Sequence, residues 1–446
     1  MRFYKFTGIF AIVLLLILAS CSEDSSNEPV NNKPAAKIFV FSDPHLLAPS
    51  LMTSGDPDEA YSEQGRKLIQ ESDAIMEAIV SQIIASDAEI VLVPGDLTKD
   101  GTKASMEKFA SYLEQLSANG IKVYVVPGNH DINNPQSNDY SSGAAVLSQN
   151  VSPAQFMQIF ADMGYSDAIA TDPHSLSYAA EPIDGLLIIG MDACRYDDNE
   201  NRPYSDVGAT FKAETQQWIE DQIREAASEG KTVIGMMHHG LVEHFSGQKL
   251  NPISSEYVVD NWQNVADNFA DLGMKLVFTG HFHANDIVKR TSAEGFIFDI
   301  ETGSTITHPC PYRILTLTAD EKLVITTDYV ESINFDTGGL PFREYSENYL
   351  LTGIDELAQN ELLREEFGFT EEQIEKLTPI AASAIIAHYA GDEVMPADAL
   401  EAINEMQNSG DQLQVLLAAV LKSIYTDLPP ADNNITIDLK TGNVIQ

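Results

Sequence analysis

Short runs of apolar, often β-branched residues recur along the first two thirds of the chain, and each run stops at a polar cluster. In the clearest of them, 121–126, Ile121, Val123 and Val125 alternate with other residues before Pro127-Gly128. Such a run is typical of a buried strand, and the Pro-Gly pair predicts a sharp turn after it. The same pattern predicts strands over 37–41, 89–93, 186–192, 232–237 and 275–279.

Segments with the helical spacing of apolar residues lie between these predicted strands. We expect helices within 59–85, 105–116, 216–227 and 257–272. Alternation of strand and helix predicts an α/β fold with a parallel sheet, in which the strands end at one edge. Three later runs, 296–300, 314–317 and 323–327, predict antiparallel strands that complete a second sheet. The polar segments 133–148 and 195–207 predict loops at the rim of a site.

The pattern changes near residue 333. Beyond it the sequence is acidic and has helical spacing, which predicts helices over 357–367, 371–389, 397–407 and 412–425 and one last strand over 434–439. We therefore expect a catalytic domain over 37–332 and a small, mostly helical C-terminal domain over 333–446.

The first residues predict an export signal. Arg2 and Lys5 precede an apolar stretch, 9–18, that is too short to cross a bilayer comfortably. The sequence Leu18-Ala19-Ser20-Cys21 resembles a bacterial lipobox, which implies cleavage before Cys21 and a lipid on that cysteine. We expect a signal peptide over 1–20, a polar tether over 21–36 and an exported, membrane-anchored lipoprotein, periplasmic or on the cell surface. A plain secretory signal is the alternative.

Charge and cysteine content narrow the choice of partners. The 446 residues include 26 Lys and Arg against 67 Asp and Glu, a formal net charge of −41. Such a surface repels phosphate backbones, which argues against a nucleic-acid polymer as partner, but a small phosphate ester can bind where cations reverse the local field. Cys194 and Cys310 have no CxxC spacing, so a disulfide between them and two free thiols both remain open.

Five polar clusters follow the predicted strands and contain six of the ten histidines of the chain. They are Asp43-Pro44-His45, Gly95-Asp96, Gly128-Asn129-His130-Asp131, His238-His239 and Gly280-His281-Phe282-His283. Because catalytic groups collect at the carboxyl ends of parallel strands, we expect these clusters to meet. Any one of them alone is more often a cap, a turn or a core histidine, but the combination predicts a shared site.

The residue types in these clusters predict two metal ions. Carboxylate, imidazole and amide oxygen without thiolate suit manganese, iron or zinc. Two cations need a bridging carboxylate, and Asp96 is the natural candidate. Alternate positions can turn Asp43 and His45 toward one ion, and His281 and His283 have the same spacing. We expect such a centre to cleave a phosphate ester.

These clusters resemble the motifs of the calcineurin-like metallophosphoesterase superfamily, over roughly 37–330. The resemblance implies a four-layer αββα sandwich around a binuclear metal centre. It implies one ion held by Asp43, His45, Asp96 and His283, and the other held by Asp96, Asn129, His238 and His281. Gly240 stands where family members often have proline, so His239 stays an alternative to His238.

The same resemblance implies a catalytic role for His130, which would stabilise developing charge or protonate the leaving oxygen while Asp131 holds its ring. The alternative for Asp131 is a turn carboxylate satisfied by backbone amides. Two ions about 3.5–4 Å apart would share a hydroxide for in-line attack on the phosphate.

Longer blocks, 43–50, 95–101 and 128–133, together with the acidic helical C-terminus, are similar to class III cyclic-nucleotide phosphodiesterases. This similarity implies a phosphodiester substrate such as a cyclic nucleotide. Two alternatives stay open: a phosphomonoesterase or nucleotidase on the same ions, and a surface-binding lipoprotein without catalysis.

Overall fold

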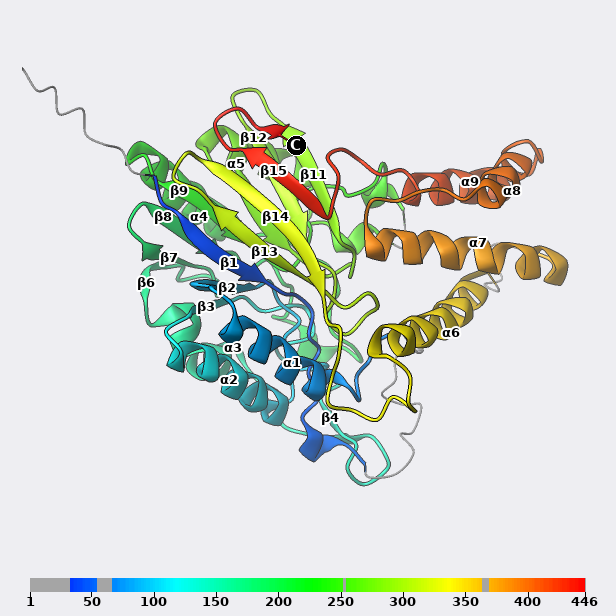
Figure 1. Cartoon of the computed structure of the whole chain (residues 1–446), viewed down its shortest axis with the longest axis horizontal. Coiled ribbons are helices and arrows are strands. Elements are labelled where there is room, and N and C mark those ends of the chain that lie inside the picture. The colour runs from blue at the N-terminus through cyan, green and yellow to red at the C-terminus, as the bar shows by residue number, and fades with distance from the viewer. Residues whose placement is uncertain (1–32, 54–65, 252–253, 363–368, 446) are drawn as a thin grey trace, which may run out of the picture. The chain divides into compact units, whose positions relative to one another are not determined.

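Two seven-stranded sheets lie face to face between helices in the computed structural model, which describes residues 33–53, 66–251, 254–362 and 369–445 (Figure 1). The first sheet has the order β16 (Asn443–Ile445), β15 (Asn434–Asp438), β14 (Lys322–Tyr329), β13 (Pro311–Leu317), β1 (Ala36–Val40), β2 (Ile90–Val93) and β3 (Lys122–Val125). The second has the order β11 (Asp286–Thr291), β12 (Phe296–Glu301), β10 (Leu276–Thr279), β9 (Thr232–Met236), β8 (Leu186–Gly190), β7 (Tyr178–Ile183) and β6 (Ala168–Thr171). The signal peptide, the lipobox and most of the tether predicted before residue 33 lie outside the described residues.

Each sheet contains a block of parallel strands, at one edge of the first sheet and in the middle of the second. In the first, β1 pairs with β2 and β2 with β3, with Val91 opposite both Phe39 and Val123. In the second, β8, β9 and β10 are parallel, with Ile234 opposite both Ile188 and Leu276. This pairing places the carboxyl ends of neighbouring strands together, as the alternation of strands and helices predicted.

Alternating strand positions divide the apolar residues between separate cores. Ile38 and Val40 of β1 face the second sheet and share a core with its Phe278, whereas Phe39 faces the helices α1 (Ser72–Ala85) and α2 (Lys103–Ala118). Helices α4 (Ala213–Ser228) and α5 (Trp262–Leu272) cover the outer face of the second sheet. The predicted four-layer αββα sandwich is thereby confirmed.

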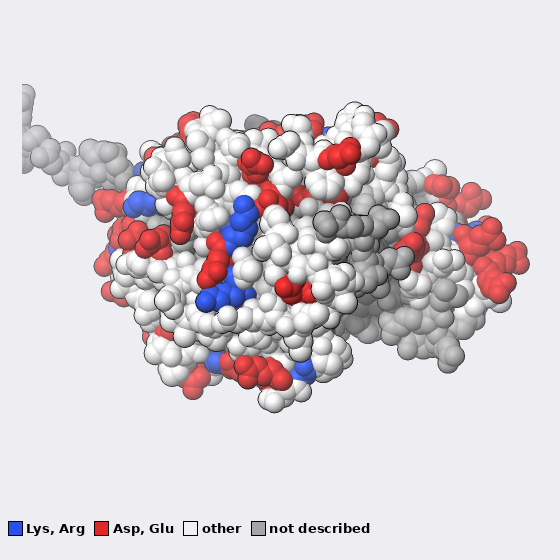
Figure 2. Space-filling view, turned by 90° about the horizontal axis from the view of Figure 1, so that it is seen from below, with Lys and Arg blue, Asp and Glu red and all other residues white. Residues whose placement is uncertain are grey.

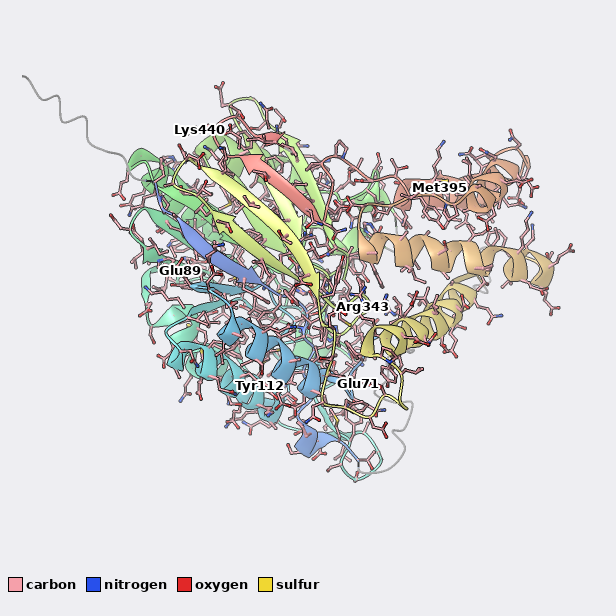
Figure 3. The ribbon with its side chains drawn as sticks, viewed as in Figure 1. Glu71, Glu89, Tyr112, Arg343, Met395 and Lys440 are labelled. Atoms are coloured by element: carbon pink, nitrogen blue, oxygen red, sulfur yellow. The ribbon has the colours of Figure 1, made fainter. Side chains whose placement is uncertain are left out.

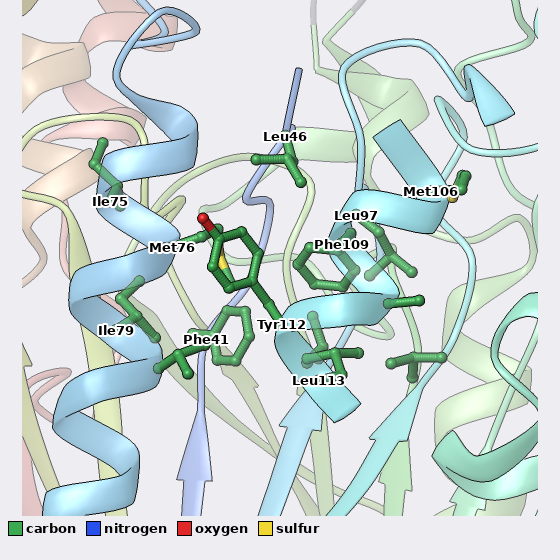
Figure 4. Close-up of a cluster of buried hydrophobic side chains, with 14 of the residues drawn as sticks. Phe41, Leu46, Ile75, Met76, Ile79, Leu97, Met106, Phe109, Tyr112 and Leu113 are labelled. Atoms are coloured by element: carbon green, nitrogen blue, oxygen red, sulfur yellow. The ribbon is translucent and has the colours of Figure 1, made fainter. Parts of the chain in front are cut away.

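Figure 4 shows the core beneath α1 and α2. Met76 and Ile79 of α1 and Phe109 and Leu113 of α2 enclose Phe41, and the Phe41 and Phe109 rings meet edge to face with centroids 6.5 Å apart. The spacing of three or four residues puts each pair on one face of its helix, as the helical pattern predicted. Truncating a buried Phe of this kind to Ala costs about 3–5 kcal/mol.

The structure corrects the predicted strand assignment in the second sheet. Strands β13 and β14 instead extend the first sheet, where β13 is antiparallel to β1 with Leu315 opposite Ile38. Strand β12 does lie in the second sheet, but it is parallel to β10, with Phe298 opposite Leu276. The pattern also missed β6, β7 and β11. Strand periodicity indicates which side chains are buried but carries no information about the neighbouring strand.

Several short helices and strands lie within the loops that connect the larger elements. Helix α3 (Pro153–Ile159) and the hairpin of β4 (Asn138–Asp139) and β5 (Val146–Leu147) follow β3. A π-helical turn covers Ala161–Tyr165, and short 3-10 helices cover Pro49–Leu51, Asn199–Asn201, Gln248–Leu250 and Ser255–Tyr257. No helix in the described part of the chain combines the length and the apolar character that crossing a membrane requires.

Four helices, α6 (Phe342–Leu362), α7 (Glu371–Ala390), α8 (Ala397–Gln407) and α9 (Gln412–Ile424), follow β14 and lie together in Figure 1. Residues of α7, α8 and α9 share a core that includes Leu377, Ile403 and Leu421. A second cluster packs α6 and α7 against Ala284, which directly follows the predicted ligand His283. The chain then returns to the first sheet through β15, so residues after 333 supply two of its strands. The division at residues 332 and 333 stays a prediction.

Side chains also connect the start of α6 to the sandwich, near Glu71 and Arg343 in Figure 3. The Tyr345 hydroxyl donates a hydrogen bond to Glu71 Oε1 at 2.5 Å, and the Arg343 guanidinium lies 4.5 Å from the centroid of the Tyr329 ring. Burial raises the pKa of Glu71. These contacts attach the helical region at its first turn.

The acidic composition is visible at the surface. Figure 2 shows Asp and Glu spread in separate groups over one face, with some Lys and Arg in a short band and others apart from it.

Cys194 and Cys310 are free thiols, so the alternative of a disulfide between them is wrong.

Candidate two-metal active site

The five strand-end clusters meet in the structure. The clusters after β1, β2 and β3 come from the first sheet, and those after β9 and β10 come from the second. Each predicted ligand is at most 8% exposed: Asp43, His45, Asp96, Asn129, His238, His281 and His283. Burial of so many polar side chains is costly unless they share partners or a cation.

Asp96 lies at the centre of the group. Its Oδ2 is 3.3 Å from His238 Nε2 and 3.5 Å from His45 Nε2, and its Oδ1 accepts a hydrogen bond from the His130 backbone N–H. Burial alone would raise the pKa of Asp96, but the neighbouring imidazoles of His238, His130 and His45 bring it well below its ordinary value. An ionised carboxylate that lies between two imidazole groups is well placed to bridge two metal ions.

Two sets of ligand atoms converge on either side of Asp96. In the first, His45 Nε2 lies 3.2 Å from His283 Nε2, and Asp43 Oδ1 lies 3.6 Å from His283 Nε2. In the second, the potential ligand atoms of Asp96, His238 and His281 lie within 4.8 Å of one another. Asn129 Oδ1 is 3.1 Å from His238 Nε2. The structure thus brings together both predicted sets, and the ligand roles themselves stay a prediction.

The orientation of the imidazoles fits bound cations. His238 Nδ1 lies 2.9 Å from the Pro94 carbonyl, which can only accept, so Nδ1 carries a proton and Nε2 points into the site. His283 Nδ1 lies 3.0 Å from Thr307 Oγ1, which likewise leaves Nε2 toward Asp43. His281 Nε2 is buried without a hydrogen-bond partner among the described residues. These nitrogens and carboxylates fit the two cations that the sequence predicts.

His239 is oriented differently from His238. Its Nε2 donates to the Val207 carbonyl at 2.8 Å, and its Nδ1 lies 4.0 Å from Cys194 Sγ. Burial, with the neighbouring His238 charge, lowers the pKa of His239 to about 3. His238 therefore points its Nε2 at Asp96, whereas the nitrogens of His239 lie against the loops of the second sheet.

The predicted contact between Asp131 and the His130 ring is wrong. His130 Nδ1 instead lies 3.2 Å from Asp100 Oδ1. The Asp131 carboxylate is fully buried and accepts hydrogen bonds from the backbone N–H groups of Leu97, Thr98 and Gly128. The reason is the turn itself: a carboxylate three residues after Gly128 reaches back to the amides of its own turn and of the one after β2.

Sequence reasoning missed Asp100. It lies four residues after Asp96, in the turn Asp96-Leu97-Thr98-Lys99-Asp100-Gly101. Its Oδ2 accepts a hydrogen bond from Lys99 Nζ at 2.6 Å, so Asp100 is held from one side and faces His130 on the other. A second carboxylate in a turn that already carries a candidate ligand was the available signal.

Two glycines make room for the carboxylates. A Cβ at Gly128 would collide with the carboxylate and the backbone nitrogen of Asp96, and a Cβ at Gly280 would collide with Ser42 and Asp43. Both glycines directly precede the predicted ligands of their turns. The strand-end backbones approach each other too closely for any side chain at these positions.

A cavity of about 550 Å³ opens at the site. Asp96, Asn129, His130, His281 and His283 lie in one part of its wall. The remainder is largely apolar and comes from aromatic residues of the second-sheet loops and aliphatic residues of α6, α7 and α9, among them Tyr257, Phe282, Leu357, Ile385, Val420 and Leu421. The candidate site therefore adjoins a space much larger than a phosphate group.

Comparison with known proteins identifies the family of the chain. The family model for calcineurin-like phosphoesterases matches residues 36–285, so the chain belongs to that family.

Individual relatives are more distant. Over 102 residues the chain is 31% identical to a 3',5'-cyclic-nucleotide phosphodiesterase of Nostoc sp. (strain PCC 7120), which amounts to 23% of this chain and 33% of that protein. A dimetal phosphatase from Danio rerio aligns with a TM-score of 0.46 and 14% identity over 68% of this chain and 98% of its own. Purple acid phosphatase PPD1 from yellow lupin (Lupinus luteus) aligns with a TM-score of 0.38 and 12% identity, covering 67% of this chain and 52% of its own.

Proposed function

We propose that the chain is a phosphodiesterase that uses two manganese, iron or zinc ions. Asp43, His45, Asp96 and His283 would hold one ion, and Asp96, Asn129, His238 and His281 would hold the other. The observation that supports this proposal is the position of Asp96 Oδ2, 3.3 Å from His238 Nε2 and 3.5 Å from His45 Nε2. When bound, such ions supply positive charge beside the phosphate oxygens and lower the pKa of a water molecule.

His130 is the protein group best placed to move a proton. Its side chain is 21% exposed and lies in the cavity wall, with Nε2 4.0 Å from Asp96 Oδ2. Asp100 accepts a hydrogen bond from Nδ1, and a proton on Nε2 could pass to the leaving oxygen of the ester. Asp100 acts through His130 and is a positioning residue.

The cavity favours a diester over a monoester. A phosphate monoester has one organic group, whereas the apolar wall formed by α6, α7 and α9 offers space for a further group beyond the metal ligands. Tyr257 and Phe282 present aromatic surface that a nucleobase could stack on, and Ile385 and Val420 present aliphatic surface that suits a hydrocarbon group. A cyclic nucleotide, as suggested by the Nostoc relative, is one such diester.

Hydrolysis of paired substrates tests the proposal. Protein loaded with Mn²⁺ should cleave bis(p-nitrophenyl) phosphate with a higher kcat/KM than p-nitrophenyl phosphate, and 3',5'-cyclic AMP provides the nucleotide comparison. Asp96→Asn serves as the control, since it removes the bridging charge and should abolish both activities. A preference for the monoester would favour the phosphomonoesterase alternative, and unchanged activity in Asp96→Asn would overturn the assignment of the site.

We further propose that a lipid on Cys21 anchors the protein to a membrane. The small residues before Cys21 and the polar segment after it support this proposal. Cys21→Ala should move the protein from the membrane fraction to the soluble fraction of the producing bacterium. Continued membrane attachment of that variant would refute lipidation.

A further inference from the structure

A second buried group of charged side chains lies outside the two-metal site. It contains two histidines and four carboxylates, and none of these side chains is more than 3% exposed: His244, Asp286, Asp299, Glu301, His388 and Glu393. Asp286 begins β11, Asp299 and Glu301 end β12, and His388 and Glu393 lie at the end of α7 and just after it. The group therefore occupies the junction between the second sheet and the C-terminal helices.

Most distances between these groups resemble those between ligands of one ion, whereas His388 Nδ1 donates a hydrogen bond to Glu393 Oε1 at 2.5 Å. His244 Nδ1 is 3.2 Å from Asp286 Oδ1, His244 Nε2 is 3.5 Å from Glu301 Oε2, and His388 Nδ1 is 3.7 Å from Asp286 Oδ2. Adjacent ligands of an octahedral ion with bonds of about 2.1 Å lie about 3.0 Å apart. Potential ligand atoms of Asp286, His388 and Glu393 all lie within 4.8 Å of one another.

Several atoms of the group lack a hydrogen-bond partner among the described residues. They are Glu301 Oε1, Glu393 Oε2 and His388 Nε2. Asp299 differs, because its carboxylate accepts from the backbone N–H of Leu241 and from the Thr279 hydroxyl, both at 2.6 Å. Asp299 is thus part of the loop structure, and the unpartnered atoms belong to the rest of the group.

The charges of the group do not balance. Four carboxylates face two histidines and the buried Arg313, so one negative charge remains even when both imidazoles are protonated. The Arg313 guanidinium donates to the backbone carbonyls of Glu301 and Asp432. Burial raises the pKa of Glu301 to about 8, so a proton on Glu301 is one way to balance the group and a bound cation is the other.

We propose that Asp286, Glu301, His388 and Glu393 form a third cation site, separate from the two-metal centre. Three carboxylates and one imidazole suit a divalent ion such as Mn²⁺ or Zn²⁺. The site connects β11 and β12 to α7. The His388 ring also contacts Phe245 and Phe282, with centroids 5.5 and 5.0 Å apart, and both phenylalanines line the cavity. The ion would thereby hold one wall of the cavity in place.

The position of bound metal tests this proposal independently of catalysis. Crystals of the full chain soaked in Mn²⁺ should show an anomalous peak among Asp286, Glu301, His388 and Glu393, in addition to any peaks at Asp96. Peaks at Asp96 alone would overturn the third site while leaving the proposed function intact. A peak at the junction without any at Asp96 would support the third site and count against the proposed function.

A variant with a matched control tests the same site in solution. Glu393→Gln keeps the size of the side chain and removes one charge, so metal content should fall by one ion per chain, and the rise in Tm on adding Mn²⁺ should shrink. Glu256→Gln removes an exposed carboxylate that precedes Tyr257 and should change neither. Unchanged metal content in a folded Glu393→Gln chain would overturn the proposal and show that protons balance the group. If Glu393→Gln fails to fold, the crystal experiment decides.

Discussion

At the scale of single residues, the candidate site is marked by unusual backbone conformations. Five of the seven predicted ligands have positive φ: 50° at Asp43, 37° at His45, 45° at Asp96, 77° at His281 and 66° at His283. A non-glycine residue in this region costs roughly 1–3 kcal/mol and persists only where the surrounding structure imposes it. The strained turns therefore lower local stability, and in this conformation they direct the carboxylates and imidazoles toward one point.

The first prediction concerns His130. His130→Gln should lower kcat on bis(p-nitrophenyl) phosphate by about 10²–10⁴, because it removes the proton donor that Asp100 orients. Metal content should stay at the wild-type value, since His130 is not among the predicted ligands. Steady-state kinetics and elemental analysis of the same preparation measure both. A variant that loses metal as well would make His130 a ligand.

The second prediction separates Asp131 from that role. Asp131→Asn should destabilise the fold by about 1–3 kcal/mol, because an amide cannot accept all the hydrogen bonds that the backbone N–H groups of Leu97, Thr98 and Gly128 donate. Urea unfolding measures the loss. A variant with wild-type stability whose kcat nonetheless fell as far as that of His130→Gln would restore the orienting role that the sequence predicted.

At the scale of elements, the turn after β3 depends on its glycine. Gly128→Ala should reduce activity and metal affinity more than a hundredfold, because its Cβ would occupy the space of the Asp96 carboxylate and backbone. Gly230→Ala is the matched control: its φ is 73°, but no atom lies within 4 Å of its Cβ. It should lose about 1 kcal/mol of stability and keep both metals. Equal effects of the two substitutions would contradict the steric explanation, because Gly230 has a positive φ and Gly128 does not.

The helices that line the cavity should affect substrate choice. Val420→Asp introduces charge into the apolar wall, so the KM of octyl p-nitrophenyl phosphate should rise about tenfold, relative to that of methyl p-nitrophenyl phosphate. Leu416→Asp, on the same helix and 59% exposed, is the control and should change neither KM. If Val420→Asp raised both values equally, the α9 wall would have no part in recognising the ester group.

These elements also show how far the sequence alone could lead. The apolar runs at 37–41, 89–93 and 121–126 correspond to β1, β2 and β3, because a strand covered on both faces is apolar at most of its positions. The pairing of β13 with β1 joins residues far apart in the chain, which no local pattern encodes. The same limit applies in the site. Whether Asp100 or Asp131 contacts His130 depends on how two separate turns pack together, which the local sequence does not encode.

At the scale of the whole molecule, the C-terminal segment ends in the sandwich from which it departs. After the four helices the chain returns as β15, whose Ile435 and Ile437 enter the core between the two sheets, followed by Leu439. The segment after residue 333 therefore combines a helical excursion with strands that the first sheet requires. Composition identified the helices but could not show that the segment after them returns to the first sheet.

Truncation tests this dependence. A chain that ends at Asn433 loses the burial of Ile435, Ile437 and Leu439, at about 1.5–3 kcal/mol for each side chain. This loss is comparable to the whole stability of a typical domain, about 5–15 kcal/mol, so the truncated chain should be largely unfolded or should melt far below the wild type. A chain that ends at Lys440 keeps β15 and removes only the exposed strand β16, and its Tm should stay close to the wild-type value. Circular dichroism on the two truncations provides the comparison. A cooperatively folded chain ending at Asn433, with the wild-type Tm, would show that the sandwich needs nothing beyond the helices.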